Sequence, residues 1–212
     1  MDFETAPEGP RWASLEQLQS ESHLETARGL VHDLEAACDD SARYRAEVLE
    51  FIDSHPDALH RTCVTGHLTG SAWVVDSTGE HGLVLFHSKI QRWLQPGGHA
   101  DGEANLARVA LLEASEESGI EGLRVWTQPV DVDIHLFVNR KSSEPDHLHL
   151  DLRFIVQPPA GSVVSGNHES EELRWVTSGQ LDSPELALDA STKRLAHRGF
   201  ELMRRQSAGA RG

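Results

Sequence analysis

The spacing of apolar residues divides the chain into a helical N-terminal part and a longer part in which strands predominate. From Ser14 to about Ser54 the apolar residues recur at helical intervals, and DSARYRAEVLEFIDSHP indicates a capped helix that ends at Pro56. We expect residues 1 to about 11 to be disordered. The rest of 1–56 is expected to form a helical extension that packs on the main domain or on a second subunit, as in a homodimer.

Short β-branched or aromatic runs follow, and one helical segment at about 104–118 interrupts them. The segment STGEHG (77–82) predicts a hairpin turn between the first two runs. A last helix is expected over 189–206, before a disordered tail at 207–212. Strands interrupted by a central helix predict a single α+β domain over 57–206, an α/β/α sandwich with a mixed sheet. The expected strands are 67–76, 83–87, 92–95, 123–127, 132–138, 147–156 and 172–177.

One predicted strand, HLHLDLRF, alternates strictly between polar and apolar residues, so its leucines should face the core. Its other face carries two imidazoles, a carboxylate and a guanidinium, and the preceding strand alternates in the same way. This polar face is either an ordinary solvated surface or the lining of a substrate pocket. The polar residues concerned are His147, His149, Asp151 and Arg153, together with Asp133 and His135.

Charge and composition narrow the classes of partner. With 34 acidic and 19 basic residues the net charge is -15, which argues against binding to nucleic acid polymers or anionic membranes. A small anionic substrate is compatible with that charge if a metal ion bridges the like charges. We find no signal sequence, no apolar run approaching the roughly 20 residues of a membrane span, and only two cysteines. A cytoplasmic protein is therefore expected.

The helix at 104–118 carries a carboxylate cluster. Glu113, Glu116 and Glu117 stand at i, i+3 and i+4, and therefore share one helical face. Three carboxylates so close repel one another unless a cation relieves them, and hard oxygen ligands suit Mg²⁺ or Mn²⁺. Gly97 and Gly98 precede the helix and allow close backbone approach, and Gly119 ends it. The alternative is a solvated acidic face.

The segment GGHADGEANLARVALLEASEESGIEG (97–122) resembles the conserved box of the Nudix hydrolase family, and the resemblance extends over about 65–205. Residues at the expected box positions are Gly98, Glu113, Ala114, Glu116, Glu117, Gly119 and Ile120. The chain departs from the box twice. Ala104 replaces a glutamate, although Glu103 precedes it, and Leu112 replaces the arginine that braces the glutamates in the family. Arg108, one turn earlier, is a partial substitute.

The resemblance implies a metal-dependent hydrolase that cleaves the diphosphate linkage of a small nucleoside diphosphate derivative. It implies that Glu113, Glu116 and Glu117 bind Mg²⁺ or Mn²⁺, together with the carbonyl of Gly98. The general base is a box glutamate or a residue of the loop GNHESEELRW, where Glu169 and Glu171 are the candidates. A degenerate domain that binds a nucleotide without turnover is the alternative, which Leu112 favours. An isomerase of the isopentenyl diphosphate type lacks its required cysteine here, since Gly98 occupies that position.

The polar strand residues are then candidates for substrate contact. Arg153 has the geometry to clamp a phosphate, and His147 and His149 to contact phosphate or carry protons. His99, directly after the glycine pair, should lie beside the metal site. A further hypothesis is that His99 binds a transition metal together with His147 or His149. Asp133 and His135 complete the expected substrate-binding set.

Overall fold

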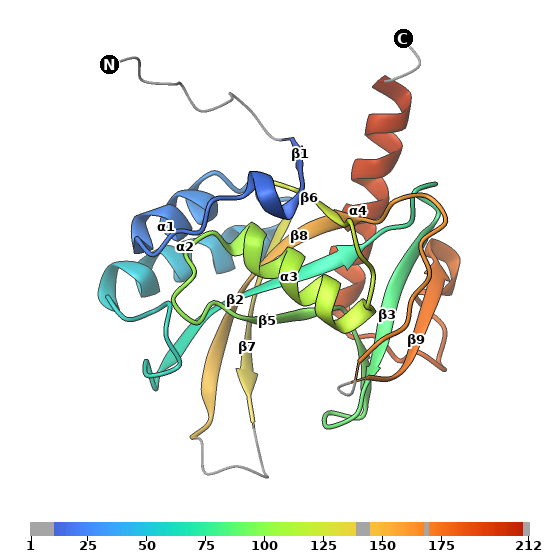
Figure 1. Ribbon diagram of the computed structural model, residues 1–212. Coiled ribbons are helices and arrows are strands. Elements are labelled where there is room, and N and C mark those ends of the chain that lie inside the picture. The colour runs from blue at the N-terminus through green and yellow to red at the C-terminus, as the bar shows by residue number, and fades with distance from the viewer. Residues whose placement is uncertain (1–10, 139–144, 168–169, 210–212) are drawn as a thin grey trace, which may run out of the picture.

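The computed structural model describes residues 11–138, 145–167 and 170–209. Two β-sheets form its centre, and Figure 1 shows how they lie among the helices. The smaller sheet has the strand order β4-β3-β9, and the larger has the order β1-β6-β8-β2-β5, with β7 also paired to β8. The strands of the larger sheet are β1 (Trp12–Ala13), β2 (Gly66–Val74), β5 (Gly97–His99), β6 (Arg124–Trp126), β7 (Asp131–Phe137) and β8 (His147–Gln157); the smaller sheet consists of β3 (His81–His87), β4 (Arg92–Leu94) and β9 (Ser170–Thr177).

The larger sheet is mixed, as predicted. β8 runs parallel to β2 on one side and antiparallel to β6 and β7 on the other. The short strand β5 lies antiparallel to β2 at the edge of the sheet. Because β2 and β8 are in register, His67 lies opposite His149 and Thr69 opposite Asp151.

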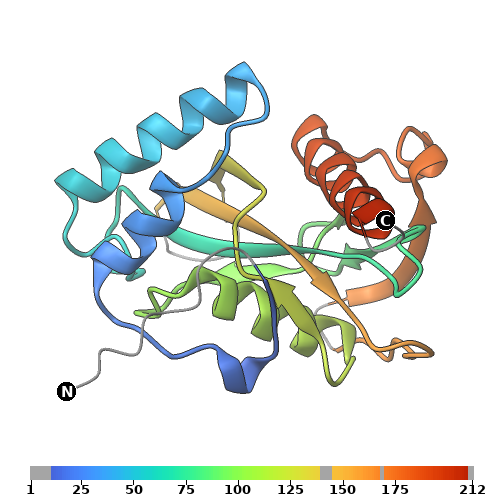
Figure 2. The same cartoon turned by 90° about the horizontal axis from the view of Figure 1, so that it is seen from above.

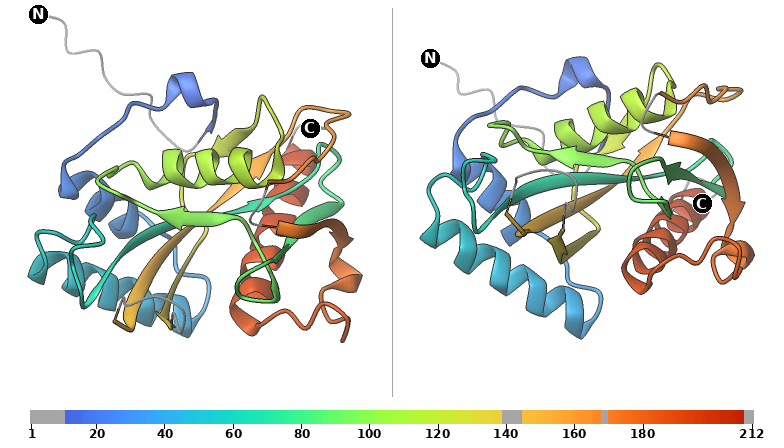
Figure 3. Two further views of the ribbon diagram at one scale, coloured as in Figure 1. Left: turned by 60° about the horizontal axis from the view of Figure 1, so that its bottom comes forward. Right: turned by 90° about the horizontal axis from the view of Figure 1, so that it is seen from below.

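Helices cover both faces of the larger sheet, which gives the predicted α/β/α arrangement. Figure 2 and Figure 3 show α3 (Leu106–Ser118) on one face, and α2 (Asp39–Ser54) and α4 (Ala190–Gly209) on the other. The contact with α3 is close: a Cβ on Gly70 of β2 would lie 2.8 Å from the carbonyl oxygen of Leu106. The leucines of β8 join the core beneath α3, as their alternation predicted.

The N-terminal region packs on the main domain, and it is less regular than expected. Its helical part is divided into η1 (Leu15–Gln17), α1 (Leu24–His32) and α2. Apolar residues of α1 and α2, including Val31 and Ile52, belong to the main core cluster. The segment before them contributes strand β1, whose Trp12 pairs with Trp126 of β6. Sequence periodicity did not reveal this two-residue strand because it is too short to show alternation.

Two other expectations need correction. The glycine pair, from which the sequence predicted close backbone approach but no strand, forms strand β5 together with His99. Helix α4 runs to Gly209, so residues 207–209, predicted as disordered tail, are helical. Throughout the part of the chain that the structure describes, no helix combines the length and apolar character needed to cross a membrane.

Candidate functional site

The sequence around α3 fixes where its carboxylates lie. Asn105 precedes the helix, and its side chain accepts a hydrogen bond from the backbone N–H of Arg108 at 3.4 Å. Gly119 ends the helix with a left-handed backbone, at a φ of 68°. The three glutamates of the predicted cluster therefore occupy its last two turns, beside strand β5.

The glycine pair of β5 meets two of these carboxylates at close range. Glu117 is only 5% exposed, and its Oε2 accepts a hydrogen bond of 3.0 Å from the backbone N–H of Gly97. Gly98 faces Glu113 so closely that a Cβ there would lie 2.2 Å from Glu113 Oε1. Glycine is needed at this position because any side chain would displace the carboxylate.

Glu116 completes the cluster from an exposed position, while the neighbouring Leu112 is half-buried. Carboxylate oxygens beside a glycine backbone form a hard donor set, so the site fits a divalent ion such as Mg²⁺ or Mn²⁺. The fit depends on a buried carboxylate, Glu117, which is a costly group to bury without compensating charge or hydrogen bonds.

Glu103 and Arg108, the two residues considered as substitutes for missing box positions, contact each other. Arg108 Nε lies 3.3 Å from Glu103 Oε2. Glu103 Oε1 also accepts hydrogen bonds from the backbone N–H groups of Glu21, at 2.8 Å, and Asn105, at 2.9 Å. Glu103 thus ties the N-terminal segment to the start of α3. Ala104, at the box position itself, is fully buried.

Of the two candidate bases, only Glu171 is among the described residues, and it lies in strand β9. Glu169 falls outside the described residues. Glu171 is exposed, and its Oε1 accepts a hydrogen bond of 2.9 Å from the side chain of Gln91.

Histidines gather on the opposite face of the sheet. Gly98 faces α3, and His99, the next residue along β5, points away from α3 because successive strand residues alternate. There it meets the histidines of β8: His99 Nε2 lies 3.3 Å from His149 Nε2, which also lies 3.3 Å from His147 Nε2. His67 of β2 stacks into the same group, 4.7 Å from His147 between ring centroids. His67 was not among the predicted site residues.

Three of these rings, His67, His99 and His149, have lowered pKa values, which favour the neutral state. Burial, followed by repulsion from neighbouring cationic groups, lowers the pKa of His99 to about 4. Burial likewise lowers the pKa of His149 far below its ordinary value, and that of His67. Neutral imidazoles have a free ring nitrogen that can accept a proton or bind a metal. His147 is also buried, so these four histidines lie largely inside the fold rather than on an open substrate surface.

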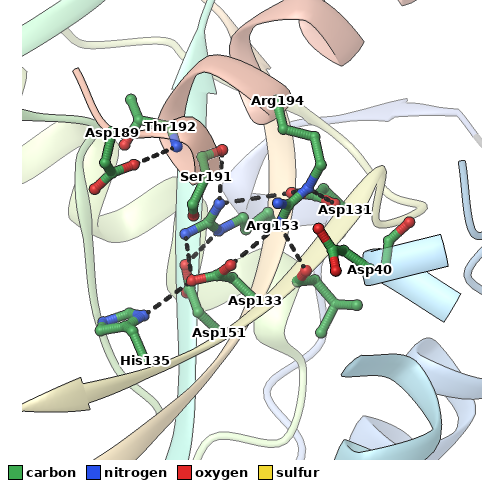
Figure 4. Close-up of polar contacts among 12 residues, drawn as sticks. Asp40, Asp131, Asp133, His135, Asp151, Arg153, Asp189, Ser191, Thr192 and Arg194 are labelled. Carbon is green, nitrogen blue, oxygen red and sulfur yellow. Dashed lines mark hydrogen bonds and ion pairs between the residues drawn. The ribbon is translucent and has the colours of Figure 1, made fainter. Parts of the chain in front are cut away.

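The structure places Arg153, the predicted phosphate clamp, in a buried ion-pair network. Its side chain is 2% exposed and forms ion pairs with three aspartates, as Figure 4 shows. Arg153 Nε donates to Asp151 at 2.8 Å, and its Nη1 donates to the backbone carbonyl of Ser191 at 3.1 Å. The sequence placed Arg153 on the correct strand face, but helix α4 covers that face, so the guanidinium is not available to substrate.

Asp133 belongs to the same buried network rather than to a substrate pocket. It pairs with Arg153 at 3.3 Å and with Arg194 of α4 at 3.1 Å. His135 Nδ1 lies 3.3 Å from the Asp133 carboxylate, and the His135 side chain is 45% exposed. Asp131 joins both arginines. Arg194 could not be predicted as a partner from the sequence, because one arginine on an amphipathic helix does not reveal which strand it faces.

One pocket lies away from both clusters. It has a volume of about 340 Å³ and lies between the turn after β2 and the loop after β8, where Asp76, His81 and Pro158 line it with Trp175 of β9. None of the predicted site residues that the structure describes takes part in its lining.

Comparison with known proteins identifies the fold. No protein-family model matches the chain, and no curated protein matches its sequence. Solved structures do. A C. elegans Ap4A hydrolase is 17% identical with a TM-score of 0.51, over 65% of this chain and 97% of that one. A Nudix hydrolase from Listeria monocytogenes is 17% identical with a TM-score of 0.51, over 66% of this chain and 95% of that one.

A third similar structure is the E. coli dihydroneopterin triphosphate pyrophosphohydrolase. It is 13% identical with a TM-score of 0.51, over 62% of this chain and 92% of that one. At these identities the likeness concerns the fold alone. It agrees with the mixed sheet, the helix after the glycine pair and the box residues described above, and the chain therefore has the fold of the Nudix hydrolases.

Proposed function

We propose that the protein is a metal-dependent hydrolase that cleaves the diphosphate linkage of a small nucleoside diphosphate derivative. The observation that carries this proposal is the meeting of α3 with β5, where the buried carboxylate of Glu117 bonds to Gly97 and Glu113 lies against Gly98. A helix that only presented charge to solvent would not bury one of its glutamates against a glycine backbone.

In this proposal the chain's own groups position a divalent ion and the substrate. A bound ion supplies Lewis-acid charge stabilisation and lowers the pKa of a bound water. The Gly97 N–H holds one oxygen of Glu117, which orients the other oxygen as a ligand. Glu113 is fixed from the side by Gly98, and Glu116 completes the set from its exposed position. The carbonyl of Gly98 is the fourth proposed ligand.

Charge and the similar structures point to the substrate class. With a net charge of -15, the chain repels a diphosphate unless cations lie between them, which agrees with a metal-dependent reaction. Two of the similar proteins are named as an Ap4A hydrolase and a dihydroneopterin triphosphate pyrophosphohydrolase. Phosphoanhydrides of nucleotides and related heterocycles are therefore the compounds to test first.

Binding without turnover is the second candidate, and Leu112 is the observation that favours it. A half-buried leucine cannot form charge-assisted hydrogen bonds to the neighbouring carboxylates, whereas an arginine at this place would. The cluster would then still hold an ion and a nucleotide, but with less precise orientation of the attacking water.

The deciding experiment is an activity screen with Mg²⁺ and Mn²⁺ against a panel of nucleoside diphosphate derivatives, with thermal-shift measurements on the same panel. Glu117→Gln should abolish cleavage, while Glu121→Gln, an exposed glutamate just after α3, should not. Compounds that raise the melting temperature without being cleaved would favour the binding domain. Absence of both effects across the panel would refute both candidates.

The general base is proposed to come from the loop before β9. Glu169→Gln should lower the rate with little change in metal affinity. The same change at Glu171, which bonds to Gln91, should have a smaller effect. Equal rates in both variants and the wild type would assign the base to a glutamate of α3.

A further inference from the structure

Four histidines converge where three neighbouring strands meet, on the face of the sheet opposite α3. His67 of β2 lies directly across from His149 of β8 in the parallel register, and His147 precedes it on the same face. His99 of β5 joins them from the far side of β2, where it pairs with Thr69. One ring nitrogen from each of the four lies within 4.8 Å of the others.

The spacing of these nitrogens fits a common metal ligand sphere. His149 Nε2 is 3.3 Å from both His99 Nε2 and His147 Nε2. An ion bound tetrahedrally at 2.0–2.1 Å from each nitrogen would have ligand nitrogens roughly 3.3 Å apart. The two 3.3 Å contacts therefore match edges of such a tetrahedron, and the fourth ring, His67, has a nitrogen within 4.8 Å of the other three.

Hydrogen bonding among the rings does not account for this arrangement. His147 Nδ1–H donates to the carbonyl of Pro145 at 2.9 Å, and in the neutral tautomer that this bond selects the lone pair lies on Nε2. If His149 Nε2 carries a proton, that single proton cannot point at both His99 and His147. If it carries none, two lone pairs face each other across 3.3 Å at the contact with His147. A cation between the rings satisfies all of these nitrogens together.

His67 provides an independent observation. Its side chain is 3% exposed, and neither ring nitrogen has a hydrogen-bond partner among the described residues. Leaving such a buried polar group without a partner destabilises the fold. The bond from His147 Nδ1 to a backbone carbonyl is the kind of outer contact that orients metal-binding histidines in proteins. The unpartnered buried ring of His67 and the oriented ring of His147 thus both support a metal ion at the centre of the four histidines.

We propose that His67, His99, His147 and His149 bind a Zn²⁺ ion that links β2, β5 and β8. Imidazole nitrogen suits Zn²⁺ and related transition metals, whereas Mg²⁺ prefers oxygen ligands, so this site is chemically distinct from the carboxylates of α3. The ion holds the edge strand β5, which has three residues and one strand neighbour in the described sheet. It thereby keeps Gly97 and Gly98 in place against Glu117 and Glu113.

The test uses the full chain without a histidine tag, stripped with a chelator and dialysed. Zn²⁺ is then titrated in competition with a chromophoric chelator, and metal content is measured by elemental analysis. We expect one Zn²⁺ per chain, a higher melting temperature with the ion, and no displacement by excess Mg²⁺. Co²⁺ should give the intense visible absorption of a tetrahedral nitrogen site. Failure of the folded wild-type chain to bind either ion would overturn the proposal.

Variants locate the site. His149→Ala and His67→Gln should weaken Zn²⁺ binding by roughly 100-fold or more, beyond the 10- to 100-fold loss typical of outer-sphere partners. His135→Ala is the matched control, since its ring lies 5.3 Å from that of His149 but outside the group of four. Glu117→Gln should bind Zn²⁺ normally, which separates this site from the proposed hydrolase site. Equal binding by wild type and His149→Ala would refute the assignment, and the Co²⁺ spectrum of the wild type decides if the variants do not fold.

Discussion

Replacing Arg153 by methionine should destabilise the folded protein rather than weaken substrate binding. The guanidinium is 2% exposed and lies among three carboxylates, at 2.8 Å from Asp151, 3.3 Å from Asp133 and 3.5 Å from Asp131. Burial alone would lower the pKa of Arg153, but these carboxylates raise it, so the group is charged. Methionine fills similar space without charge. It leaves Arg194 as the ion-pair partner of Asp131 and Asp133, while Asp151 keeps only uncharged hydrogen bonds, from the hydroxyls of Thr69 and Ser71.

The expected loss follows from the number of charges involved. With Arg153 and Arg194 against three aspartates, the network has a net charge of -1; without Arg153 it has -2, in a region shielded from water. Removing one partner of a buried ion pair costs about 3–5 kcal/mol. Against a typical total of about 5–15 kcal/mol, this is a large fraction of the stability. For a chain of this size it corresponds to a fall of roughly 6–20 °C in melting temperature.

Urea denaturation at pH 7.5, followed by circular dichroism, measures the free energy of unfolding. Arg28→Met is the matched control, because Arg28 pairs with Asp53 at 2.7 Å with both side chains partly exposed, and such pairs contribute about 0–1 kcal/mol. Adding Asp151→Asn to Arg153→Met should recover part of the loss by removing one uncompensated charge. The buried-network interpretation is wrong if the free energy of unfolding of Arg153→Met lies within about 1 kcal/mol of the wild-type value and the variant instead raises the KM for a cleaved substrate.

Three further changes test other parts of the structure. Gly98→Ala places a Cβ 2.2 Å from Glu113 Oε1, so metal-dependent activity should fall at nearly unchanged melting temperature; unaltered activity would contradict the proposed ligand set. Leu112→Arg should raise Mg²⁺ affinity or the rate by bracing the carboxylates, and a lower rate would count against this. In chelator-treated protein, burial lowers the pKa of His149 in the folded state, whereas in the unfolded chain this pKa is near 6.5. As the pH falls, the unfolded state therefore takes up a proton at His149 before the folded state does. The contribution of His149 to stability is complete above about pH 6.5 and should fall by about 1.4 kcal/mol at pH 5.5, and His149→Gln should show a shallower decline in urea titrations.

The carboxylate cluster could be predicted because its geometry is local. The positions i, i+3 and i+4 share a helix face in any fold. Once α3 forms, its geometry alone therefore brings together the side chains of Glu113, Glu116 and Glu117. The glycines before and after the helix are likewise local signals, one allowing close approach and the other a left-handed end. What the pattern could not give was the unequal burial of the three glutamates, which depends on how β5 approaches the helix.

The histidine cluster could be predicted only in part, because it depends on strand pairing. Alternation placed His147 and His149 on one face, and the glycine pair drew attention to His99. His67 escaped notice because its role depends on the parallel pairing of β2 with β8, and a sequence does not state which strands are neighbours. The burial of Arg153 was not predicted for a related reason: alternation identified its face, but nothing local shows that α4 covers that face.

The strand β5 explains why two such different ligand sets lie close together. Gly98 and His99 are consecutive, and consecutive strand residues face opposite sides of a sheet, so one meets the carboxylates of α3 and the other meets the imidazoles of β2 and β8. A shift of one residue in the pairing of β5 with β2 would turn His99 toward α3 and separate it from the other histidines. A metal ion bound by the histidines would oppose that shift. The pairing register of the three-residue strand β5 with β2 therefore determines the geometry of both the proposed oxygen site and the proposed nitrogen site. A metal ion would stabilise this register beyond what the backbone hydrogen bonds contribute.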